Sequence, residues 1–348
     1  MSARTGPTDT QESLVLARGI AQYMSRIRQR RAPATYETYR QAIKLFLVLL
    51  HDELGVDPWS VPVSALQPAW VEHFLAHLQR HKSIETEHVY SRAVVGFYKE
   101  AANRGWASLN VDALRDTLRH LRRRKGRRLP RFPQEELESI LEFVQRASLP
   151  PREDDASHRE RLRILRDAAF LLTLADTGLR VSEACALKRG DVDLAEGQVR
   201  VIGKGNQEAV VRISNRVIRA LRRYLKERAP LDGAQSTTAL AELALFAQHG
   251  KRAGQRIKPI SRWTGADIVT RWTNLALSEE TRANLQAQDM PITPHTFRHY
   301  FVTTVLRGTG NLRLAQRFAR HASPTTTTRY LHLSDEEMDI AYHEIFNE

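Results

Sequence analysis

The chain has 348 residues, which is enough for two domains that each bury a core. It has no apolar run of membrane-spanning length, its polar segment 1–10 lacks the apolar core of a secretory signal, and its single cysteine, Cys185, excludes an internal disulfide, so we expect a cytoplasmic protein with no membrane partner. Lys and Arg total 53 against 40 Asp and Glu, and the net charge of +13 favours a polyanionic partner such as nucleic acid.

The N-terminal part, residues 12–120, has the apolar spacing of a small all-helical bundle. It follows a segment, residues 1–11, that we expect to be disordered. Helical spacing is seen in four stretches: residues 12–30, 35–51, 84–103 and a stretch that begins at Pro68. We expect this bundle to be the first of two domains.

A basic segment follows the bundle, over residues 121–130, and contains no acidic residue. Its cations are Arg122, Arg123, Arg124, Lys125, Arg127 and Arg128. Such a run can be a solvated linker, and it can also lie along a phosphate backbone. We expect it to do both, linking the two domains and binding DNA.

The second domain is expected over residues 131–348, as a mainly helical unit with one small sheet. Strand-like alternation over residues 198–202 and 208–213 encloses the turn sequence at residues 203–206, which predicts a hairpin. Helices are expected over residues 133–146, 159–177, 214–228, 265–277, 296–306, 312–320 and 335–346.

Five short motifs occur in this half of the chain. In chain order they are Thr177–Glu183 (TGLRVSE), Gly203-Lys204-Gly205, His295–His299 (HTFRH), His321-Ala322-Ser323 and Thr328-Arg329-Tyr330. Each motif is weak alone, but their order and spacing resemble those of the tyrosine recombinases, the phage integrase family, over about residues 12–346. The resemblance implies a mainly α fold with a small β-sheet: a two-domain clamp on DNA, with an all-helical core-binding (SAM-like) domain and an α+β catalytic domain.

The resemblance also implies the catalytic residues: Arg180, Lys204, His295, Arg298, His321 and Tyr330. Tyr330 would attack a phosphodiester and leave a 3′-phosphotyrosyl bond and a free 5′-hydroxyl. The permanently charged guanidiniums of Arg180 and Arg298 would stabilise the negative charge that builds on the phosphate. Lys204 would be the general acid for the leaving hydroxyl.

His295 and His321 would hydrogen-bond the phosphate or help to take the Tyr330 proton, because a phenol with an ordinary pKa near 10 needs a base or a cationic site. Each residue also has a plainer interpretation. Arg180 could be a helix-end ion pair with Glu183, and Glu183 could thereby also support the active site. Lys204 could be a surface lysine, His295 a capping or core histidine, and Tyr330 an ordinary tyrosine; the conjunction of motifs decides against these.

His295 and His299 have the spacing of a zinc pair, but Arg298 lies between them and no carboxylate follows at ligand spacing, so we expect no metal. Two departures from the family pattern stand out. Gln207 occupies a position after the hairpin turn that is often basic in the family, and Arg320 precedes His321 where the family prefers glycine. The first predicts weaker contact of the hairpin with DNA, and the second places a side chain where the family usually has none.

The expected function is site-specific DNA recombination, in integration, excision or resolution, without ATP, metal or other cofactor. The partners are double-stranded DNA sites and further copies of the chain, and the resemblance implies four protomers in a synapse of two sites. Two alternatives stay open: DNA relaxation by a type IB topoisomerase-like enzyme, and a catalytically inactive DNA-binding regulator.

Overall fold

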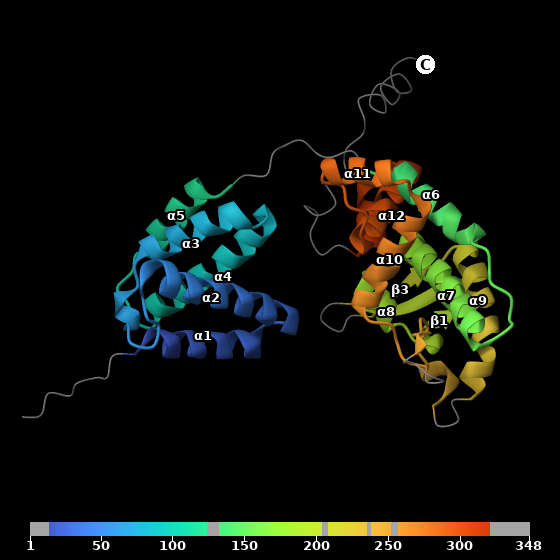
Figure 1. The fold of residues 1–348 in the computed structure, drawn as a ribbon, viewed down its shortest axis with the longest axis horizontal. Coiled ribbons are helices and arrows are strands. Elements are labelled where there is room, and N and C mark those ends of the chain that lie inside the picture. The colour runs from blue at the N-terminus through green and yellow to red at the C-terminus, as the bar shows by residue number, and fades with distance from the viewer. Residues whose placement is uncertain (1–13, 124–131, 204–207, 235–237, 252–256, 321–348) are drawn as a thin grey trace, which may run out of the picture. The chain divides into compact units, whose positions relative to one another are not determined.

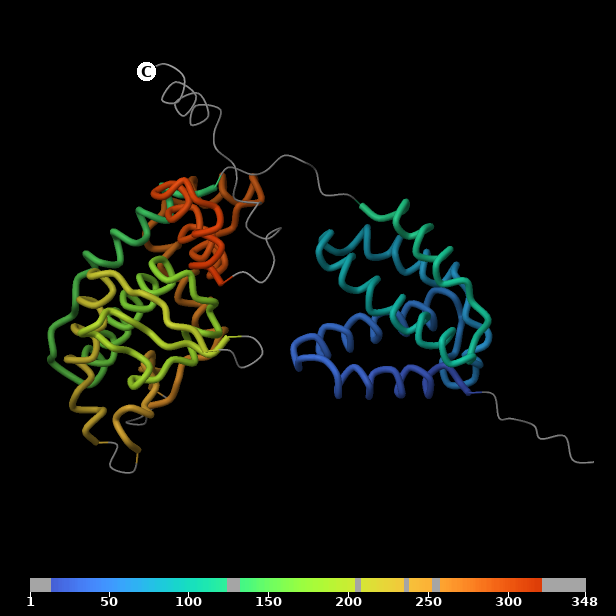
Figure 2. Tube along the Cα trace, turned by 180° about the vertical axis from the view of Figure 1, so that it is seen from behind, coloured from blue at the N-terminus to red at the C-terminus, as the bar shows by residue number. Residues whose placement is uncertain are grey.

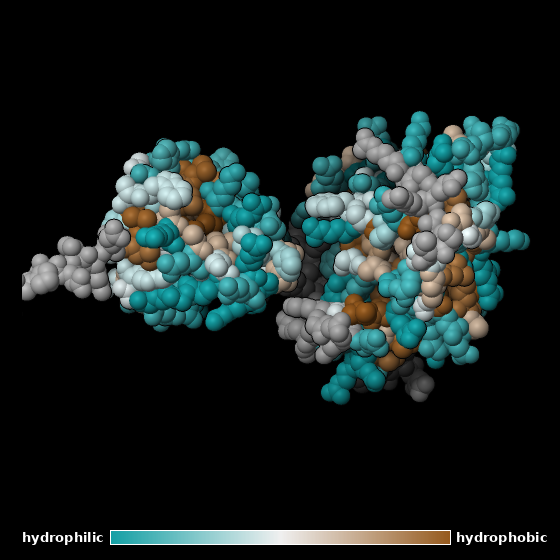
Figure 3. Space-filling model, turned by 90° about the horizontal axis from the view of Figure 1, so that it is seen from below, coloured by the Kyte–Doolittle hydropathy of each residue, from teal (hydrophilic) through white to brown (hydrophobic). Residues whose placement is uncertain are grey.

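The computed structural model describes residues 14–123, 132–203, 208–234, 238–251 and 257–320. These residues form two compact units, within Met1–Leu129 and Pro130–Glu348, and each unit has its own hydrophobic core (Figures 1 and 2). The face of each unit that Figure 3 shows is largely hydrophilic, with hydrophobic side chains scattered over it. The fold is mainly helical with one small sheet, as the sequence predicts.

The described residues of the N-terminal unit form helices joined by short connecting segments, and no strand is present among them. Its helices are α1 (Leu16–Arg30), α2 (Pro33–Leu54), α3 (Pro68–His81), α4 (Ile84–Asn103) and α5 (Val111–Leu121), with a short 3-10 turn at Val63–Ala65. Pro33 and Pro68 begin α2 and α3, where the missing N–H costs nothing. The α4 helix packs on α2 and α3 around a core that includes Phe46, Phe74 and Tyr98.

The first helix begins at Leu16 and not at residue 12, which corrects the sequence prediction. Val15 is extended and pairs with Pro62, and the Leu14 carbonyl accepts from the Val63 N–H at 2.8 Å. These backbone contacts fix the preceding residues to a distant segment. The helix therefore starts only after the pairing ends.

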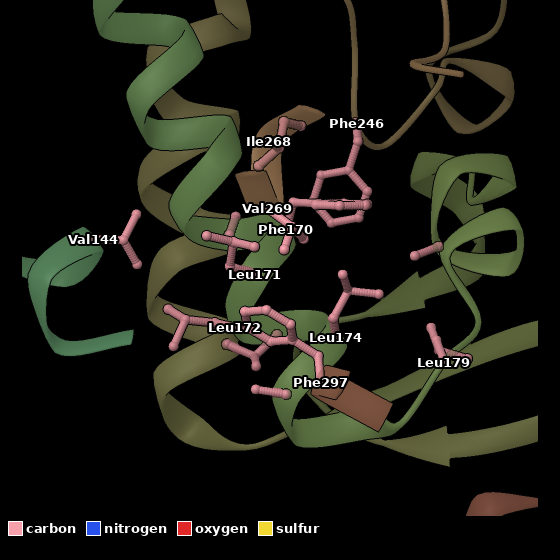
Figure 4. Close-up of a cluster of buried hydrophobic side chains, with 14 of the residues drawn as sticks. Val144, Phe170, Leu171, Leu172, Leu174, Leu179, Phe246, Ile268, Val269 and Phe297 are labelled. Atoms are coloured by element: carbon pink, nitrogen blue, oxygen red, sulfur yellow. The ribbon is translucent and has the colours of Figure 1, made fainter. Parts of the chain in front are cut away.

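The C-terminal unit packs helices around α7. Its helices are α6 (Gln134–Arg146), α7 (Asp155–Thr177), α8 (Val181–Ala186), α9 (Asn215–Gly233), α10 (Arg262–Ala276), α11 (Glu279–Ala287), α12 (Pro294–Thr309) and α13 (Leu312–Ala319). The α7 helix contacts α6, α9 and α12, and its Phe170, Leu171, Leu172 and Leu174 lie in the core together with Phe297 of α12 (Figure 4).

A three-stranded antiparallel sheet lies beside these helices in the same unit. Its strands are β1 (Val192–Asp193), β2 (Gln198–Ile202) and β3 (Glu208–Arg212), in the order β1-β2-β3. In the β2–β3 pair, Val199 faces Val211, and both side chains are buried. The predicted hairpin is confirmed, although the turn between its strands, residues 204–207, lies outside the described residues.

Several helix ends differ from the predicted ones. The α7 helix starts four residues early because Asp154 and Ser157 form a capping box. The α9 helix runs past Arg228 to Gly233 and contains Pro230, because the buried Arg228 guanidinium pairs with Asp232 one turn later, at 2.9 Å. The short α8 and α11 helices and β1 were not predicted, and the predicted helix 335–346 lies outside the described residues.

Candidate active site

The end of α7 places Arg180 at the surface. The helix stops at Thr177 because Gly178 adopts the left-handed conformation, with φ of 60°. A Cβ on Gly178 would also collide with the ring of Phe301, so both backbone and space require glycine here. Leu179 is then buried in the core, and the next residue, Arg180, emerges as the N-cap of α8 with 47% of its side chain exposed.

Glu183 holds Arg180 in place. Its carboxylate accepts from the Arg180 backbone N–H at 2.8 Å and from the Arg180 Nη1 at 2.9 Å. It also accepts from the Nη2 of Arg320 at 2.7 Å. Burial opposes the charged form, but these donors outweigh it and lower the pKa of Glu183 below the ordinary value. The ion pair expected from the sequence is therefore present, with a third member that the sequence did not reveal.

The start of α12 brings in His295 and Arg298. Thr293 and Thr296 form a capping box, and Pro294 takes the first helical position, which fixes both side chains on the first turn and a half. Arg298 is only 2% exposed, and its guanidinium donates to the carbonyl oxygens of Gly178 and Ala319. One buried cation thus connects the end of α7, the start of α12 and the end of α13.

His295 lies at the surface beside both arginines. Its ring meets that of His299 edge to face, with centroids 4.4 Å apart. Partial burial lowers its pKa below the ordinary histidine value, and the positive charges of Arg298 and Arg180 lower it further. A neutral imidazole can accept a proton, as the expected role of His295 requires.

Three of the six predicted catalytic residues, Arg180, His295 and Arg298, therefore meet at one place. The other three lie outside the described residues: Lys204, His321 and Tyr330. The flanking elements are described: β2 ends at Ile202, two residues before Lys204, and α13 ends at Ala319, two residues before His321.

The described residues contain no group of three or more His, Cys, Asp or Glu side chains that could hold a metal. Cys185 is buried, and burial raises the pKa of its thiol to about 12, which disfavours the thiolate that metal binding or nucleophilic attack needs. In the same part of the chain, no helix is long and apolar enough to cross a membrane.

A second candidate site is a groove of about 860 Å³ in the N-terminal unit. It is lined by side chains of α1, α2, α4 and α5 and by the two residues after α5. Its cationic lining residues are Arg31, Arg92, Arg115, Arg119, Arg122 and Arg123, and no acidic residue lines it. The basic run in the sequence marks Arg119, which lies just before the linker, as well as Arg122 and Arg123. The spacing of Arg115 and Arg119, four residues apart on α5, was an available signal for Arg115, whereas Arg92 comes from another helix.

Two residues of the predicted basic linker belong to this unit. Arg123 donates from its backbone and from Nε to Glu87, at 3.1 and 2.6 Å, and from Nη2 to the Lys82 carbonyl at 2.6 Å. Glu87 is fully buried, so Arg123 neutralises a buried carboxylate. Burial lowers the pKa of Arg122, and nearby Arg92 lowers it further against the opposing effect of Glu87. Arg124, Lys125, Arg127 and Arg128 lie outside the described residues.

Comparison with known proteins shows which family the chain resembles over most of its length. The model of the phage integrase family matches residues 130–337. The tyrosine recombinase XerC of Pelobacter propionicus is 30% identical over 304 residues, covering 87% of this chain and 86% of that protein. The XerC of Xylella fastidiosa is 29% identical over 311 residues, covering 88% and 89%.

Two solved structures share the fold. The Tn1549 transposon integrase in complex with a circular intermediate DNA has a TM-score of 0.61 at 18% identity, covering 94% of this chain and 99% of that one. A lambda integrase dimer bound to a COC′ core site has a TM-score of 0.58 at 18% identity, covering 92% and 96%. The chain belongs to the phage integrase family, and it is a tyrosine recombinase similar to XerC and XerD.

Proposed function

We propose that this tyrosine recombinase cleaves and rejoins duplex DNA at specific sites through a covalent bond to Tyr330. The observation that carries the proposal is the position of Arg298. Its contacts with Gly178 and Ala319 hold Arg180, His295 and the end of α13 together, just before the chain reaches His321 and Tyr330. The exposed guanidinium of Arg180, the buried guanidinium of Arg298 and a neutral imidazole near them suit a phosphodiester that gains negative charge.

In the proposed reaction, the Tyr330 hydroxyl oxygen attacks the phosphorus. The oxygen–phosphorus bond to Tyr330 forms as the bond to the 5′-oxygen breaks, which leaves a 3′-phosphotyrosyl link. His295, with His321, accepts the phenol proton, and Lys204 donates a proton to the departing 5′-oxygen. A 5′-hydroxyl of an incoming strand reverses these steps. Because the link conserves the energy of the broken phosphodiester, no ATP is consumed.

For the N-terminal unit, we propose that the arginine-lined groove binds the DNA backbone. No acidic residue lines the groove, although Arg115, Arg119 and Arg123 are paired with Asp112, Asp116 and Glu87 outside the lining. Arg31, Arg92 and Arg122 add positive charge to the same lining, and this excess of cations favours phosphate over neutral ligands. We propose further that four protomers assemble on two sites. The lambda integrase dimer on its core site, which shares the fold, supports assembly on DNA.

The test is a selection for covalent adducts. The protein is incubated with a pool of nicked duplexes of randomised sequence, and the DNA that stays attached under denaturing conditions is sequenced. We expect a defined sequence to be enriched, called the selected duplex below, and adduct formation to proceed in EDTA. Tyr330→Phe should bind the selected duplex with unchanged affinity and form no adduct.

Adducts with Tyr330→Phe, or loss of adducts on chelation and recovery with magnesium, would contradict the proposed chemistry. Adducts without sequence enrichment, together with relaxation of supercoiled plasmid, would indicate the topoisomerase alternative. Site binding by the wild-type protein with no adduct under any condition would indicate the inactive regulator.

A further inference from the structure

Arg320 is the first residue after α13 and directly precedes the segment of His321. Its backbone is left-handed, with φ of 53° and ψ of 45°. Among the described residues, only Asp289 is a second non-glycine residue with positive φ. A side chain disfavours this conformation, which is the one that glycine adopts readily. The sequence thus keeps a long side chain where the backbone favours glycine, so the side chain itself must contribute something.

The contribution is a contact across 137 residues of sequence. Arg320 Nη2 donates to Glu183 Oε2 at 2.7 Å, and the two side chains are 18% and 8% exposed. The other carboxylate oxygen, Oε1, accepts from Arg180 Nη1 at 2.9 Å. One buried carboxylate therefore holds two guanidiniums, of which Arg180 faces solvent and Arg320 is largely covered.

The net charge of Arg180, Glu183 and Arg320 determines how strongly the Arg180 guanidinium can attract a phosphate. Arg180 and Glu183 alone form a neutral pair, in which the carboxylate competes with a phosphate for the guanidinium. Arg320, which is largely covered, donates a hydrogen bond to Glu183 Oε2 and so provides a second positive charge for the carboxylate. The three residues together then have a net charge of +1. The same helix end contacts the other arginine, because the Ala319 carbonyl accepts from Arg298.

We propose that Arg320 is a positioning residue for the proposed reaction: through Glu183 it fixes the Arg180 guanidinium and leaves its positive charge available to the scissile phosphate. This inference rests on the proposed function. Arg320 acts through Glu183 and not by touching DNA.

The experiment measures the single-turnover rate of adduct formation on the selected duplex at saturating protein, with affinity measured separately by band shift. Arg320→Ala and Arg320→Gly should both slow the reaction about tenfold, the effect expected for losing one charged hydrogen bond near the reacting group, with affinity changed less than about twofold. Arg320→Lys should retain most of the rate because it keeps the charge. Arg317→Ala, which removes an exposed cation from the same helix, is the matched control and should react like the wild type.

If Arg320 acts through the charge of Glu183, removing that charge should compensate for the loss of Arg320, which a purely structural role does not predict. Adding Glu183→Gln to Arg320→Ala should recover most of the lost rate, because removing the carboxylate charge restores the net +1. A wild-type rate for Arg320→Gly would overturn the proposal, since only backbone strain would then matter. Absence of recovery in the double variant would also overturn it, and would indicate direct phosphate contact or local unfolding.

A second readout does not depend on activity. The unfolding free energies of the wild type, Arg320→Ala, Glu183→Gln and the double variant form a cycle that measures the contact itself. A coupling between the two positions supports the contact, and strictly additive effects would refute it even if the wild-type protein formed no adduct. Failure of adduct formation in the wild type, with coupling intact, would instead count against the proposed function.

Discussion

Arg180 and Arg298 have the same proposed role but different surroundings. The Arg180 side chain is 47% exposed and is held by one carboxylate. Arg298 is 2% exposed and donates to two backbone carbonyls from separate segments. An exposed arginine affects charge at the site, whereas the buried one also connects the elements that build the site. The same substitution should therefore have different consequences at the two positions.

Arg180→Lys and Arg298→Lys should each slow adduct formation about 100-fold or more, because an ammonium cannot reproduce the planar fork of a guanidinium at a phosphate. Only Arg298→Lys should also lower the free energy of unfolding, by about 2 kcal/mol, since it leaves a buried carbonyl without its donor. Single-turnover kinetics and urea denaturation measure the two effects. Equal stability of the two variants would show that Arg298 does not tie the segments together.

His249 gives the catalytic unit a dependence on pH. The Tyr224 hydroxyl accepts from Arg228 at 3.1 Å and from the Ala247 N–H at 3.2 Å, so its own hydrogen goes to His249 Nε2 at 2.7 Å. The imidazole must be neutral to accept it. Burial, and then the positive charges of Arg166 and Arg228, lower the pKa of His249 from 6.5 to about 3.

Because the folded pKa is depressed, the unfolded chain binds the proton first as the pH falls. The stability that the neutral imidazole contributes is complete above pH 6.5 and is lost between pH 6.5 and about 3. The slope is about 1.4 kcal/mol per pH unit. His249→Gln, which keeps an acceptor for Tyr224, should flatten this dependence in urea denaturation at about pH 7 and about pH 5.5. His51→Gln, at an exposed histidine, is the control, and an unchanged slope in His249→Gln would refute the assignment.

At the scale of elements, the two arginines that follow α5, Arg122 and Arg123, have different surroundings and different roles. Arg123 neutralises the fully buried Glu87 and donates to the carbonyl of Lys82, the C-cap of α3. Arg122 has a buried Nε without a hydrogen-bond partner among the described residues and lines the groove beside Arg92. Adjacent arginines in the sequence therefore serve the fold and the groove separately.

Arg123→Ala should lower the free energy of unfolding by about 2–3 kcal/mol, because it leaves a buried carboxylate unpaired. Arg122→Ala should leave stability within about 0.5 kcal/mol and reduce the slope of log affinity against log salt by about one, as loss of one phosphate contact requires. Urea denaturation and band shifts at several salt concentrations measure both. If Arg122→Ala leaves the salt slope unchanged, the groove does not hold a phosphate there.

Elements with strong local signals could be predicted, and long-range pairs could not. The predicted range of α4, residues 84–103, agrees with the structure at both ends because its apolar spacing is regular, and in the structure Ser83 caps its first turn. The Arg320–Glu183 and Arg123–Glu87 pairs join residues 137 and 36 positions apart, and no local pattern marks them. The α9 helix was predicted too short because Pro230 normally ends a helix, whereas here the Arg228–Asp232 pair lies across it.

At the scale of the whole molecule, the proposed catalytic residues rest on the order of the motifs and on no fold argument. That order grouped Arg180, His295 and Arg298. In the structure the charges of both arginines act on His295, and Arg298 bonds the Gly178 carbonyl two residues before Arg180, although 118 residues separate the two arginines in sequence. An interface between two copies of the chain is formed by two surfaces, and a single chain does not show which of its surfaces meet. The sequence offers one such surface at its C-terminal end, outside the described residues.

The segment after Leu333 is predicted to dock onto a neighbouring protomer. Ser334 and Glu337 have the spacing of a capping box. The residues that follow give an expected helix of about three turns its apolar face: Met338, Ile340, Ala341, Ile345 and Phe346. So short a helix is marginal in water and needs a surface that covers its apolar face. That surface can belong to the same chain, as is usual for proteins in general, or to another copy. The resemblance to the tyrosine recombinases, which commonly pass such a terminal helix to the neighbouring protomer, implies another copy.

Truncation after Leu333 should therefore leave binding to a single selected duplex nearly unchanged while greatly reducing the synaptic complex of two duplexes, because only the latter needs contact between neighbours across the assembly. Band shifts on one duplex and synapsis assays with two differently labelled duplexes measure the two properties on the same protein. A matched variant, Ile345→Asp with Phe346→Asp in the full-length chain, should show the same separation, because it places charge on the apolar face without removing the segment. Normal synapsis by either variant would show that the tail does not link protomers, and a lowered unfolding midpoint of the isolated protomer would show that it packs on its own chain instead.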